Sequence, residues 1–567
     1  MTAVAHREVE RKYEFPEGAE ARVDWSALEG FTVSAEPVEH RMEAVYHDTQ
    51  DMALGRRLVA LRRRRGGADD GWHVKFHGPG GRHELQVPLL RTPERMPASV
   101  RNLLAGLTGG QELRPVATLR TARTVHRLSD GTGTEVAELA ADVVEAVDER
   151  TGTARSWSEW EVELLDGTVP EERQEQIFAA VEAVVRAAGG RPSTSRAKIA
   201  RALGQEDDDA GESGGQPQDG QESKKDKRGK KDQQGKKNKQ GNKDQQGKKK
   251  SGKKKDEGAT AGGANGPEVL RAVLGELAEQ LVLWDFKVRL DVPDAVHQMR
   301  VTSRSLRSVL RAARPFFEGS EAEELDAGLR ELARTLSAAR DAEVTADLLT
   351  GRVEALDGRV DPAASESLRQ RAEEQARTAA ARVRRHVTGR EHLRLLADVQ
   401  DVAAAPSLTE ECARLSGREA ADALVERSLR KVVRVAGQDA AAEPAGGPDS
   451  GPDGGHRLEH LHDVRKAVKR VRYVDAVLDR TGHRPGKRLR RAARDAENYQ
   501  DELGRIMDAA VVERWLADTA AALRRAGDDR YAVGALHGAE VVRLRAGAEG
   551  GADVVRVLRS QLREDLG

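Results

Sequence analysis

The chain has 567 residues, and its 94 Lys and Arg residues nearly balance its 95 Asp and Glu residues. This length is too great for one hydrophobic core and predicts two or more domains. The single cysteine, Cys412, excludes an intrachain disulfide and a multi-cysteine metal site, and it is typical of a reducing compartment. Aromatic residues make up only 3%, so we expect any large domain rich in Ala, Leu, Val and Arg to be helical.

The N-terminus reaches charged residues at His6, Arg7 and Glu8 without the apolar stretch of a signal peptide. No later segment has the uninterrupted apolar length of a membrane span. We therefore expect a cytoplasmic protein.

Residues 1–204 are predicted to form strands joined by short polar turns, because apolar and polar residues alternate there. Strands are expected at 44–49, 58–65, 71–76, 82–87, 120–128, 135–147 and 159–164. Helices are expected at 98–107 and 171–188, and a turn is expected at 78–81.

Charged residues share faces of these predicted strands. Glu8, Glu10 and Lys12 occupy every second position, so two carboxylates and one ammonium lie on one face. One such pattern is more typical of a solvated strand, but it recurs at Arg62 and Arg64, at Arg82 and Glu84, and at Glu159, Glu161 and Glu163. If the sheet closes into a barrel, these charges line its lumen, where burial is costly unless they pair or hold ions. The pattern therefore indicates a functional site for metal and phosphate.

These segments resemble the CYTH domains, the triphosphate tunnel metalloenzymes. The resemblance is carried, in order, by Glu8-x-Glu10-x-Lys12, Tyr46-x-Asp48-Thr49, Leu61-Arg62-x-Arg64, Lys75, Arg82-x-Glu84, Arg123, Glu138 with Asp142, Glu159-x-Glu161-x-Glu163 and Lys198. It implies an eight-stranded antiparallel β-tunnel that hydrolyses a triphosphate with Mg²⁺ or Mn²⁺. An alanine stands between Glu138 and Asp142 where the family often has a second aspartate, which puts both acids in doubt as site residues.

The resemblance also implies roles for individual residues. The metal ligands would be Glu8, Glu10, Glu159, Glu161 and Glu163, and Glu8, Glu10 and Lys12 would form the catalytic group. The triphosphate would contact Lys12, Arg62, Arg64, Lys75, Arg82, Arg123 and Lys198. The chemistry is consistent, because Mg²⁺ and Mn²⁺ prefer oxygen ligands and guanidinium groups bind phosphate oxygens bidentately. The alternative is a barrel of this shape that no longer turns over substrate.

Residues 205–265 form a predicted linker rich in Lys, Gly and Gln, which lacks the apolar residues that a core requires. We expect a disordered, self-repelling tether. Its lysines, concentrated over 224–255, would also attract polyanions such as polyphosphate, RNA or DNA.

Residues 266–567 change to a period of 3.6 and predict a helical domain with two internal repeats, at about 266–436 and 456–567. A first stripe, His297, Arg300, Arg304 and Arg307, recurs as a second stripe, His462, Arg465, Lys469 and Arg472, with identical offsets of three, four and three. On a helix these offsets fall within an arc of roughly 80°, so each set forms one cationic face.

This half resembles the CHAD domain, a helical module with an internal repeat that is associated with polyphosphate binding. Packing of the repeats about a pseudo-twofold axis would bring both stripes to one groove. Its two histidines are expected to titrate near neutrality, so they would strengthen binding at lower pH. Asp341 and Asp508 are expected to pair with arginines. The alternative is that these Arg-rich helices are merely solvated or paired with neighbouring acids.

The sequence thus predicts an α+β multidomain protein, an inorganic triphosphatase whose helical domain recruits polyphosphate, located in the cytoplasm or at polyphosphate granules. Three alternatives remain open. The tunnel could belong to an adenylate cyclase, although no clear set of residues for adenine is present, or to a thiamine triphosphatase. The protein could be a non-catalytic one that binds polyphosphate and targets granules. It could also bind nucleic acid through the linker and basic helices, although aromatic stacking residues are scarce.

Overall fold

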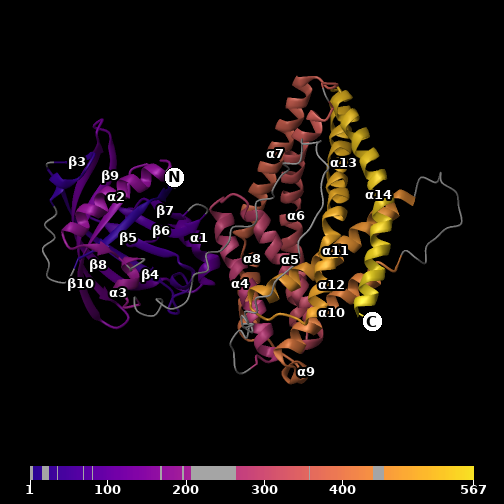
Figure 1. Cartoon of the computed structure of the whole chain (residues 1–567), viewed down its shortest axis with the longest axis horizontal. Coiled ribbons are helices and arrows are strands. Elements are labelled where there is room, and N and C mark those ends of the chain that lie inside the picture. Colours follow the sequence, from indigo (N-terminus) through magenta and orange to yellow (C-terminus); the bar gives the residue numbers. More distant parts are fainter. Residues whose placement is uncertain are drawn as a thin grey trace, which may run out of the picture.

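The computed structural model describes residues 4–15, 24–34, 36–67, 69–78, 81–166, 169–193, 197–205, 263–356, 358–438 and 453–566. The predicted lysine-rich linker lies almost entirely outside the described residues. The chain forms an antiparallel sheet domain followed by a helical domain (Figure 1). None of the helices in the described part of the chain combines the length and apolarity that a membrane span requires.

One sheet contains all the strands of the first domain. They are β1 (Val4–Glu8), β2 (Glu10–Glu14), β3 (Phe31–Val33), β4 (Val38–Asp48), β5 (Ala60–Arg65), β6 (Gly71–Gly78), β7 (Gly81–Val87), β8 (Arg114–Asp130), β9 (Glu135–Asp148), β10 (Thr153–Leu164) and β11 (Arg191–Pro192). Their hydrogen-bonded order is β1-β7-β6-β5-β4-β8-β9-β10-β2-β11, with β3 paired to β8. Since β1 pairs with β7 and β2 pairs with β10, the first extended run closes the sheet into a tunnel.

The expected count of eight strands is wrong, because the hydrogen-bonded path contains ten strands and β3 lies off it. Two short strands, β3 and β11, are additions to the tunnel. The first run is also divided at Val9, where the chain changes partner from β7 to β10 and the Val9 carbonyl accepts a hydrogen bond from the Leu164 amide at 3.0 Å. Alternation cannot reveal this change, because the chain stays extended through it.

The predicted strands and helices of this domain are present, with shifted ends. Helices α1 (Ala98–Thr108) and α2 (Glu171–Ala187) are confirmed, and β8 begins at Arg114, ahead of the predicted residue 120. The prediction of a strand from residue 58 is wrong at its start. The short 3-10 helix η2 (Gly55–Arg57) precedes Leu58, which has a left-handed backbone with φ of 56°.

Alternation gives the sheet an apolar outer face and a charged lumen. On one side of the tunnel, Trp72, Val74 and Phe76 of β6 pack against α1. On another side, Tyr13 of β2 and Val162 of β10 pack against α2. The residues between them along each strand therefore point into the lumen.

The second domain is entirely helical. Its helices are α4 (Gly266–Arg289), α5 (Ala295–Ala313), α6 (Glu321–Glu354), α7 (Pro362–Val387), α8 (Arg390–Ala404), α9 (Glu410–Arg414), α10 (Gly417–Val435), α11 (Asp453–Arg480), α12 (Lys487–Asn498), α13 (Gln500–Ala526) and α14 (Tyr531–Leu566). Helices α6 and α7 form one arm and α13 and α14 form another, both rising from a base that includes α4, α5, α10 and α11 (Figure 1).

Helices α4 and α10 of the base begin in the same way. Asn265 and Ser416 cap α4 and α10 with matching capping boxes, and the two caps pair with each other in an isolated β-bridge. A Cβ on Gly266 would lie 2.2 Å from the Cys412 carbonyl oxygen, and one on Gly417 would lie 2.6 Å from the Ala264 carbonyl oxygen. Both positions therefore need glycine, because the starts of α4 and α10 lie against each other.

Candidate active site and cationic groove

Three rows of side chains cross neighbouring strands β2, β10 and β9 on the lumen face of the tunnel. In order across the strands, the rows are Glu10, Glu163 and Glu138; then Lys12, Glu161 and Ala140; then Glu14, Glu159 and Asp142. Since strand side chains alternate, residues two apart share one face and the rows lie on the same wall. This register gathers the predicted carboxylates in one place.

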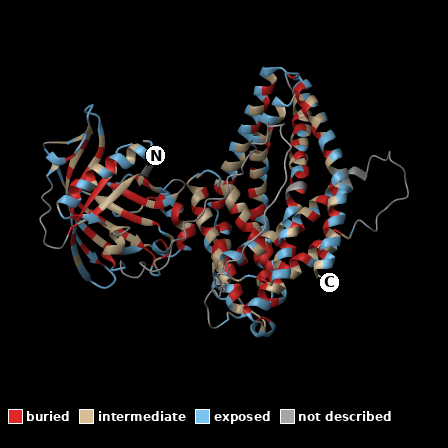
Figure 2. Ribbon diagram, viewed as in Figure 1, coloured by how far each residue is buried: buried red, intermediate tan, exposed pale blue. Residues whose placement is uncertain are grey.

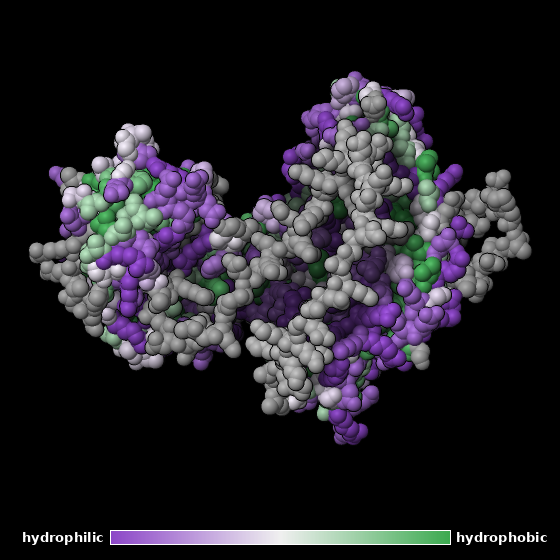
Figure 3. Space-filling view, viewed as in Figure 1, coloured by the Kyte–Doolittle hydropathy of each residue, from purple (hydrophilic) through white to green (hydrophobic). Residues whose placement is uncertain are grey.

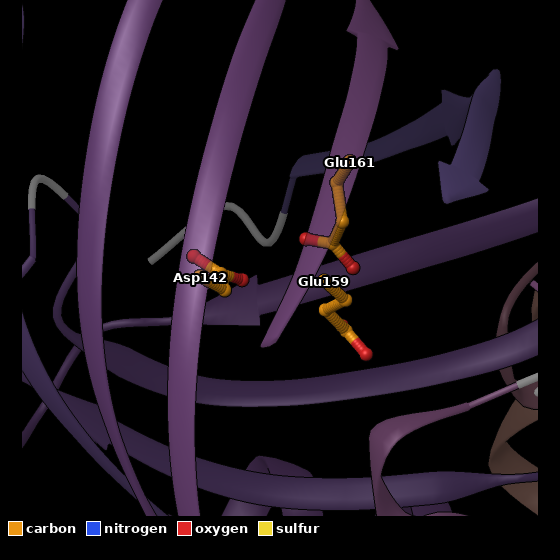
Figure 4. A group of neighbouring side chains, drawn as sticks. All are labelled: Asp142, Glu159 and Glu161. Carbon is orange, nitrogen blue, oxygen red and sulfur yellow. The ribbon is translucent and has the colours of Figure 1, made fainter. Parts of the chain in front are cut away.

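Asp142, Glu159 and Glu161 form a buried group whose oxygen atoms lie within 4.8 Å of one another. Figure 4 shows Asp142 on one strand facing Glu159 and Glu161 on its neighbour. The ammonium group of Lys198, at the start of α3 (Lys198–Ala202), lies 2.8 Å from both Asp142 and Glu159 and 2.7 Å from Glu161. Burial alone would lower the pKa of Lys198, but these carboxylates outweigh burial and raise it. The lysine therefore neutralises the acidic group from within.

Two more cations bind the same carboxylates. Arg123 donates to Asp142 at 2.7 Å and also pairs with Glu161, and Lys12 pairs with Glu161 as well. Burial would raise the pKa of Glu161, but Lys12, Lys198 and Arg123 hold it well below its usual range. Glu161 is therefore ionised at neutral pH.

The row that contains Glu163 has the opposite balance. Burial raises the pKa of Glu163, Glu10, Glu161 and Glu138 raise it further, and the Lys75 ammonium, which lowers it, does not offset the total rise. Crowded carboxylates of this kind are relieved by a divalent cation, and their oxygen donors suit Mg²⁺ or Mn²⁺. Among the described residues, the carboxylates whose oxygens converge closely enough for one ion are the neighbouring Asp142, Glu159 and Glu161, so the donor set of this wall fits a metal ion there.

The opposite wall of the lumen is cationic. Arg82 donates to Glu10 at 2.7 Å, Arg62 lies 3.2 Å from Glu84, and Lys75 lies 3.5 Å from Glu84. Burial and the neighbouring Arg62 lower the pKa of Arg64 to about 10, so it stays charged.

A cavity of about 600 Å³ brings the predicted residues together. Its lining includes every predicted triphosphate contact, namely Lys12, Arg62, Arg64, Lys75, Arg82, Arg123 and Lys198, together with Glu10, Glu161 and Glu163. Glu159 lies beside it through Lys198. The backbone of Glu8 pairs with that of Arg82, and the side chain of Glu8 lies outside what the structure describes.

The predicted site set omits several residues that the structure places on the lumen. Glu138 faces Glu163 across β9 and β10, and Asp142 is paired with Arg123 and Lys198. Glu84 also accepts from His73 at 2.8 Å, and Tyr46 lines the cavity. Burial would raise the pKa of Tyr46, but nearby Arg62 and Lys75 lower it. The pairing register of β9 against β10 would have revealed the first two residues.

In the helical domain, α5 and α11 pack together and bring the two stripes side by side. All eight stripe residues are half-buried. Burial and the positive charges of Arg465, Arg300 and Arg304 lower the pKa of Lys469 to about 7. Because two of these arginines lie on the other helix, the two stripes form one cationic surface, called the cationic groove below. Hydrophilic residues predominate on the visible face of this domain in Figure 3.

The groove cations have few partners among the described residues. Arg304 bonds Ser337 at 3.1 Å, Arg307 pairs with Asp326 at 2.9 Å, and Arg465 pairs with Asp508 at 3.8 Å. The buried Nε atoms of Arg300, Arg304 and Arg465 have no hydrogen-bond partner in the described part of the chain.

Family models match both halves of the chain. A CYTH domain is found over residues 6–186, and a CHAD domain is found over residues 272–517. The chain is a CYTH–CHAD protein. Two relatives match nearly the whole chain. They are the uncharacterized proteins MT2285 and Rv2226 of two Mycobacterium tuberculosis strains. Each is 31% identical over 557 residues, which cover 94% of this chain and 92% of the relative.

Solved structures resemble each domain separately. The CHAD domain of the plant Ricinus communis is 22% identical, covers 51% of this chain and 94% of that chain, and has a TM-score of 0.38. A putative adenylate cyclase from Bacillus halodurans is 21% identical, covers 35% of this chain and 97% of that chain, and has a TM-score of 0.25. The putative adenylyl cyclase HpAC1 from Hippeastrum, for which a dominant triphosphatase activity is stated, is 18% identical with a TM-score of 0.23 and covers 35% and 96% of the two chains.

Two expectations for the CHAD groove have different outcomes. Asp508 pairs with Arg465, as expected. The expectation that both histidines titrate near neutrality is wrong, because burial and neighbouring cations lower the pKa of His297 and of His462 to about 4. Sequence spacing shows that these histidines join a cationic stripe, but it does not show how far the stripe is desolvated.

Proposed function

We propose that the CYTH tunnel hydrolyses inorganic triphosphate with Mg²⁺ or Mn²⁺ and that the CHAD groove binds polyphosphate. One observation carries the first half of this proposal. A single cavity is lined by all seven predicted triphosphate contacts together with the carboxylates Glu10, Glu138, Glu161 and Glu163.

The residues of the tunnel have complementary roles in this proposal. Arg62, Lys75 and Arg82 would bind phosphate oxygens, and the triphosphate would take the place of the carboxylates that these cations now contact. Glu10, released from Arg82, would join Glu161 and Glu163, with Glu8 as a further predicted ligand, in holding the divalent ion. That ion would neutralise charge on the phosphate chain. The oxygen of a water molecule would form the new bond to phosphorus as the bridging P–O bond to the leaving phosphate breaks, and the protons of that water would pass to the products and solvent.

Polyphosphate binding by the CHAD groove is supported by its unsatisfied positive charge. Arg300, Arg465 and Lys469 all have lowered pKa values, because burial and neighbouring cations disfavour their charged forms. A bound polyanion would reverse this effect, since it places negative charge beside each of them.

A second candidate substrate is an organic triphosphate. A chamber of about 650 Å³ shares Glu10, Lys12 and Lys75 with the tunnel cavity, and its own lining includes apolar residues such as Met52 and Val116. An uncharged substituent on a triphosphate would find apolar contacts there while the phosphates stay among the cations.

The test is phosphate release by the full chain from tripolyphosphate, long-chain polyphosphate, ATP and thiamine triphosphate, each with Mg²⁺ and with Mn²⁺. We expect release from tripolyphosphate that Glu8→Ala/Glu10→Ala abolishes, while the matched surface variant Glu175→Gln retains it. Glu175 is exposed and pairs with Arg11 outside the tunnel. No release from any substrate, with polyphosphate still bound, would make the protein a polyphosphate receptor.

A further inference from the structure

Helix α4 of the CHAD domain belongs to two hydrophobic cores. Most of it, from Val269 to Leu281, packs in the core of the helical domain. Near its C-terminal end, Val282 and Phe286 are almost fully buried in the cluster on the outer face of the CYTH sheet. These two residues lie four apart and share one face of the helix.

The contact reaches the strands that carry phosphate-binding cations. The rings of Phe286 and Phe76 meet edge to face with centroids 5.3 Å apart, and Trp72 and Leu61 belong to the same cluster. Phe76 follows Lys75 on β6, and Leu61 precedes Arg62 on β5, so each buried residue is adjacent to a lumen cation. Figure 1 places α1 beside α4, and buried residues continue from the strands into both helices (Figure 2).

A polar contact joins the same helix to the end of the tunnel. Arg57 of η2 donates to both carboxylate oxygens of Glu279 in α4, at 2.8 and 2.7 Å, and also donates to the backbone carbonyls of Ala53 and Leu107 at 3.0 Å. It further contacts Gln400 of α8 at 3.3 Å. Only 5% of the Arg57 side chain is exposed, so one guanidinium ties η2 to α1 and to two CHAD helices.

The segment that Arg57 holds, residues 49–59, forms part of the tunnel wall. Its residues Met52, Gly55 and Leu58 line the apolar chamber that shares Glu10, Lys12, Tyr46, Lys75 and Arg82 with the main cavity. Met52 and Leu58 have φ angles of 58° and 56°, a left-handed backbone that persists in such residues only where surrounding contacts hold it.

We infer that the CHAD domain is a structural part of the CYTH active site, and that Arg57, through Glu279, is a positioning residue for triphosphate binding. Arg57 does not touch the phosphates. It holds segment 49–59 against α4, and this contact closes the chamber beside the lumen cations. The inference rests on the proposed function of the tunnel, and it states that the two domains act as one unit.

A charge-swap experiment on the full chain tests the inference. The variants are Arg57→Glu, Glu279→Arg and the double swap. The matched control is Arg186→Glu, which reverses a charge in an exposed pair with Glu182 on α2. We expect each single variant to raise KM for tripolyphosphate about tenfold with kcat within about twofold, and the control to match wild type. The double swap should restore only part of the loss in KM, because it re-forms the ion pair with α4 but not the bonds that Arg57 donates to the carbonyls of Ala53 and Leu107.

A substrate-free measurement separates this inference from the proposed function. Amide hydrogen exchange over 49–59 should be faster in both single variants and slower again in the double swap. Unchanged exchange overturns the inference, even if the wild type is active. Lowered thermal stability with wild-type KM shows a purely structural contact and also overturns it. The remaining case is a wild type that binds tripolyphosphate without hydrolysing it, with faster exchange in the single variants. If the single variants then leave the Kd for tripolyphosphate unchanged, both proposals are overturned. If they shift that Kd, only the proposed hydrolysis is overturned.

Discussion

The tunnel and the CHAD groove both concentrate cations, but among the described residues the tunnel supplies many counter-charges and the groove supplies few. In the tunnel, carboxylates outweigh burial and raise the pKa values of Lys12, Arg123 and Lys198. In the groove, burial and like charges lower the pKa values of Arg300 and Lys469. Apart from Arg64, whose pKa burial and Arg62 lower to about 10, the Lys and Arg residues of the tunnel with shifted pKa values are therefore stabilised as ions, whereas those of the groove are destabilised.

Under the proposed function, this difference would correspond to two kinds of anion site. A ligand entering the tunnel must exchange with existing ion pairs, which selects for a short ligand that replaces many contacts at once and brings a metal ion for the released carboxylates. A ligand entering the groove displaces few protein partners and relieves repulsion. The groove therefore suits any dense polyanion of sufficient length, and the tunnel suits a defined one.

We expect the largest effect from a substitution that removes the cation at the centre of the tunnel's acidic group. Lys198→Met leaves Asp142, Glu159 and Glu161 without the ammonium that lies within 2.8 Å of all three. We expect a loss of about 3–5 kcal/mol in the free energy of unfolding at pH 7, because breaking a buried charge cluster leaves uncompensated charge. Urea unfolding measures it.

The control for that variant is Lys466→Met, which removes a surface partner of Asp463 and should cost less than about 1 kcal/mol. Addition of Mn²⁺ should restore part of the stability of Lys198→Met, since a divalent cation can occupy the acidic group. Equal stability of Lys198→Met and wild type would contradict the conclusion that the tunnel depends on this lysine to neutralise its carboxylates.

We expect the next largest effect, on polyphosphate binding, from a variant that lacks three arginines of the groove. Arg300→Gln/Arg304→Gln/Arg465→Gln should weaken binding of long-chain polyphosphate about 100-fold and lower the salt slope of log K by about two. Because these arginines repel one another, we expect unfolding stability to stay equal or to rise by up to about 1 kcal/mol. Titration calorimetry at several salt concentrations, beside thermal unfolding, checks both expectations.

The matched control, Arg334→Gln/Arg414→Gln/Arg556→Gln, removes three exposed arginines of the same domain. It should change the polyphosphate Kd by less than about threefold. A similar loss in both triple variants would mean that the domain binds polyphosphate by total charge, and the distinction between groove and surface would fail.

How far the sequence predicts the tunnel depends on the kind of information each residue needs. Period-two alternation assigns faces, so Glu10, Lys75 and Arg82 are placed on the lumen without any structure. Their partners depend on strand register. The Lys198 contact joins residues far apart in sequence, and the change of partner at Val9 leaves the alternation intact.

In the helical domain, too, sequence periodicity shows which face of an element a residue occupies but not which residues it contacts. Identical offsets predict two cationic helical faces, and the structure confirms that α5 and α11 meet. The role of α4 is missed, because an amphipathic pattern shows that Val282 and Phe286 are buried but does not show which domain buries them. Burial also accounts for the wrong prediction for the histidines.

A smaller effect comes from the pKa of Lys469, which is lowered to about 7. Polyphosphate favours the protonated lysine, so binding takes up a proton and the affinity is highest below pH 7. As the pH rises from 6 to 8 the affinity should fall about tenfold from this group alone. Lys469→Arg should flatten the profile, because arginine stays protonated. Titrations in two buffers of different ionisation enthalpy count the protons, and zero uptake at pH 7.5 would contradict the lowered pKa.

The smallest effect belongs to the histidines. With pKa values lowered to about 4, His297 and His462 are neutral in the free groove at pH 7. His297→Gln/His462→Gln should therefore change the polyphosphate Kd by less than about twofold between pH 6 and 8, because the charges that the ligand meets come from the arginines and Lys469. A steep pH dependence that this variant removes, and that Lys469→Arg leaves intact, would assign the proton uptake to imidazole. The groove would then be less desolvated than its buried guanidinium groups indicate, and its contrast with the tunnel would be one of degree.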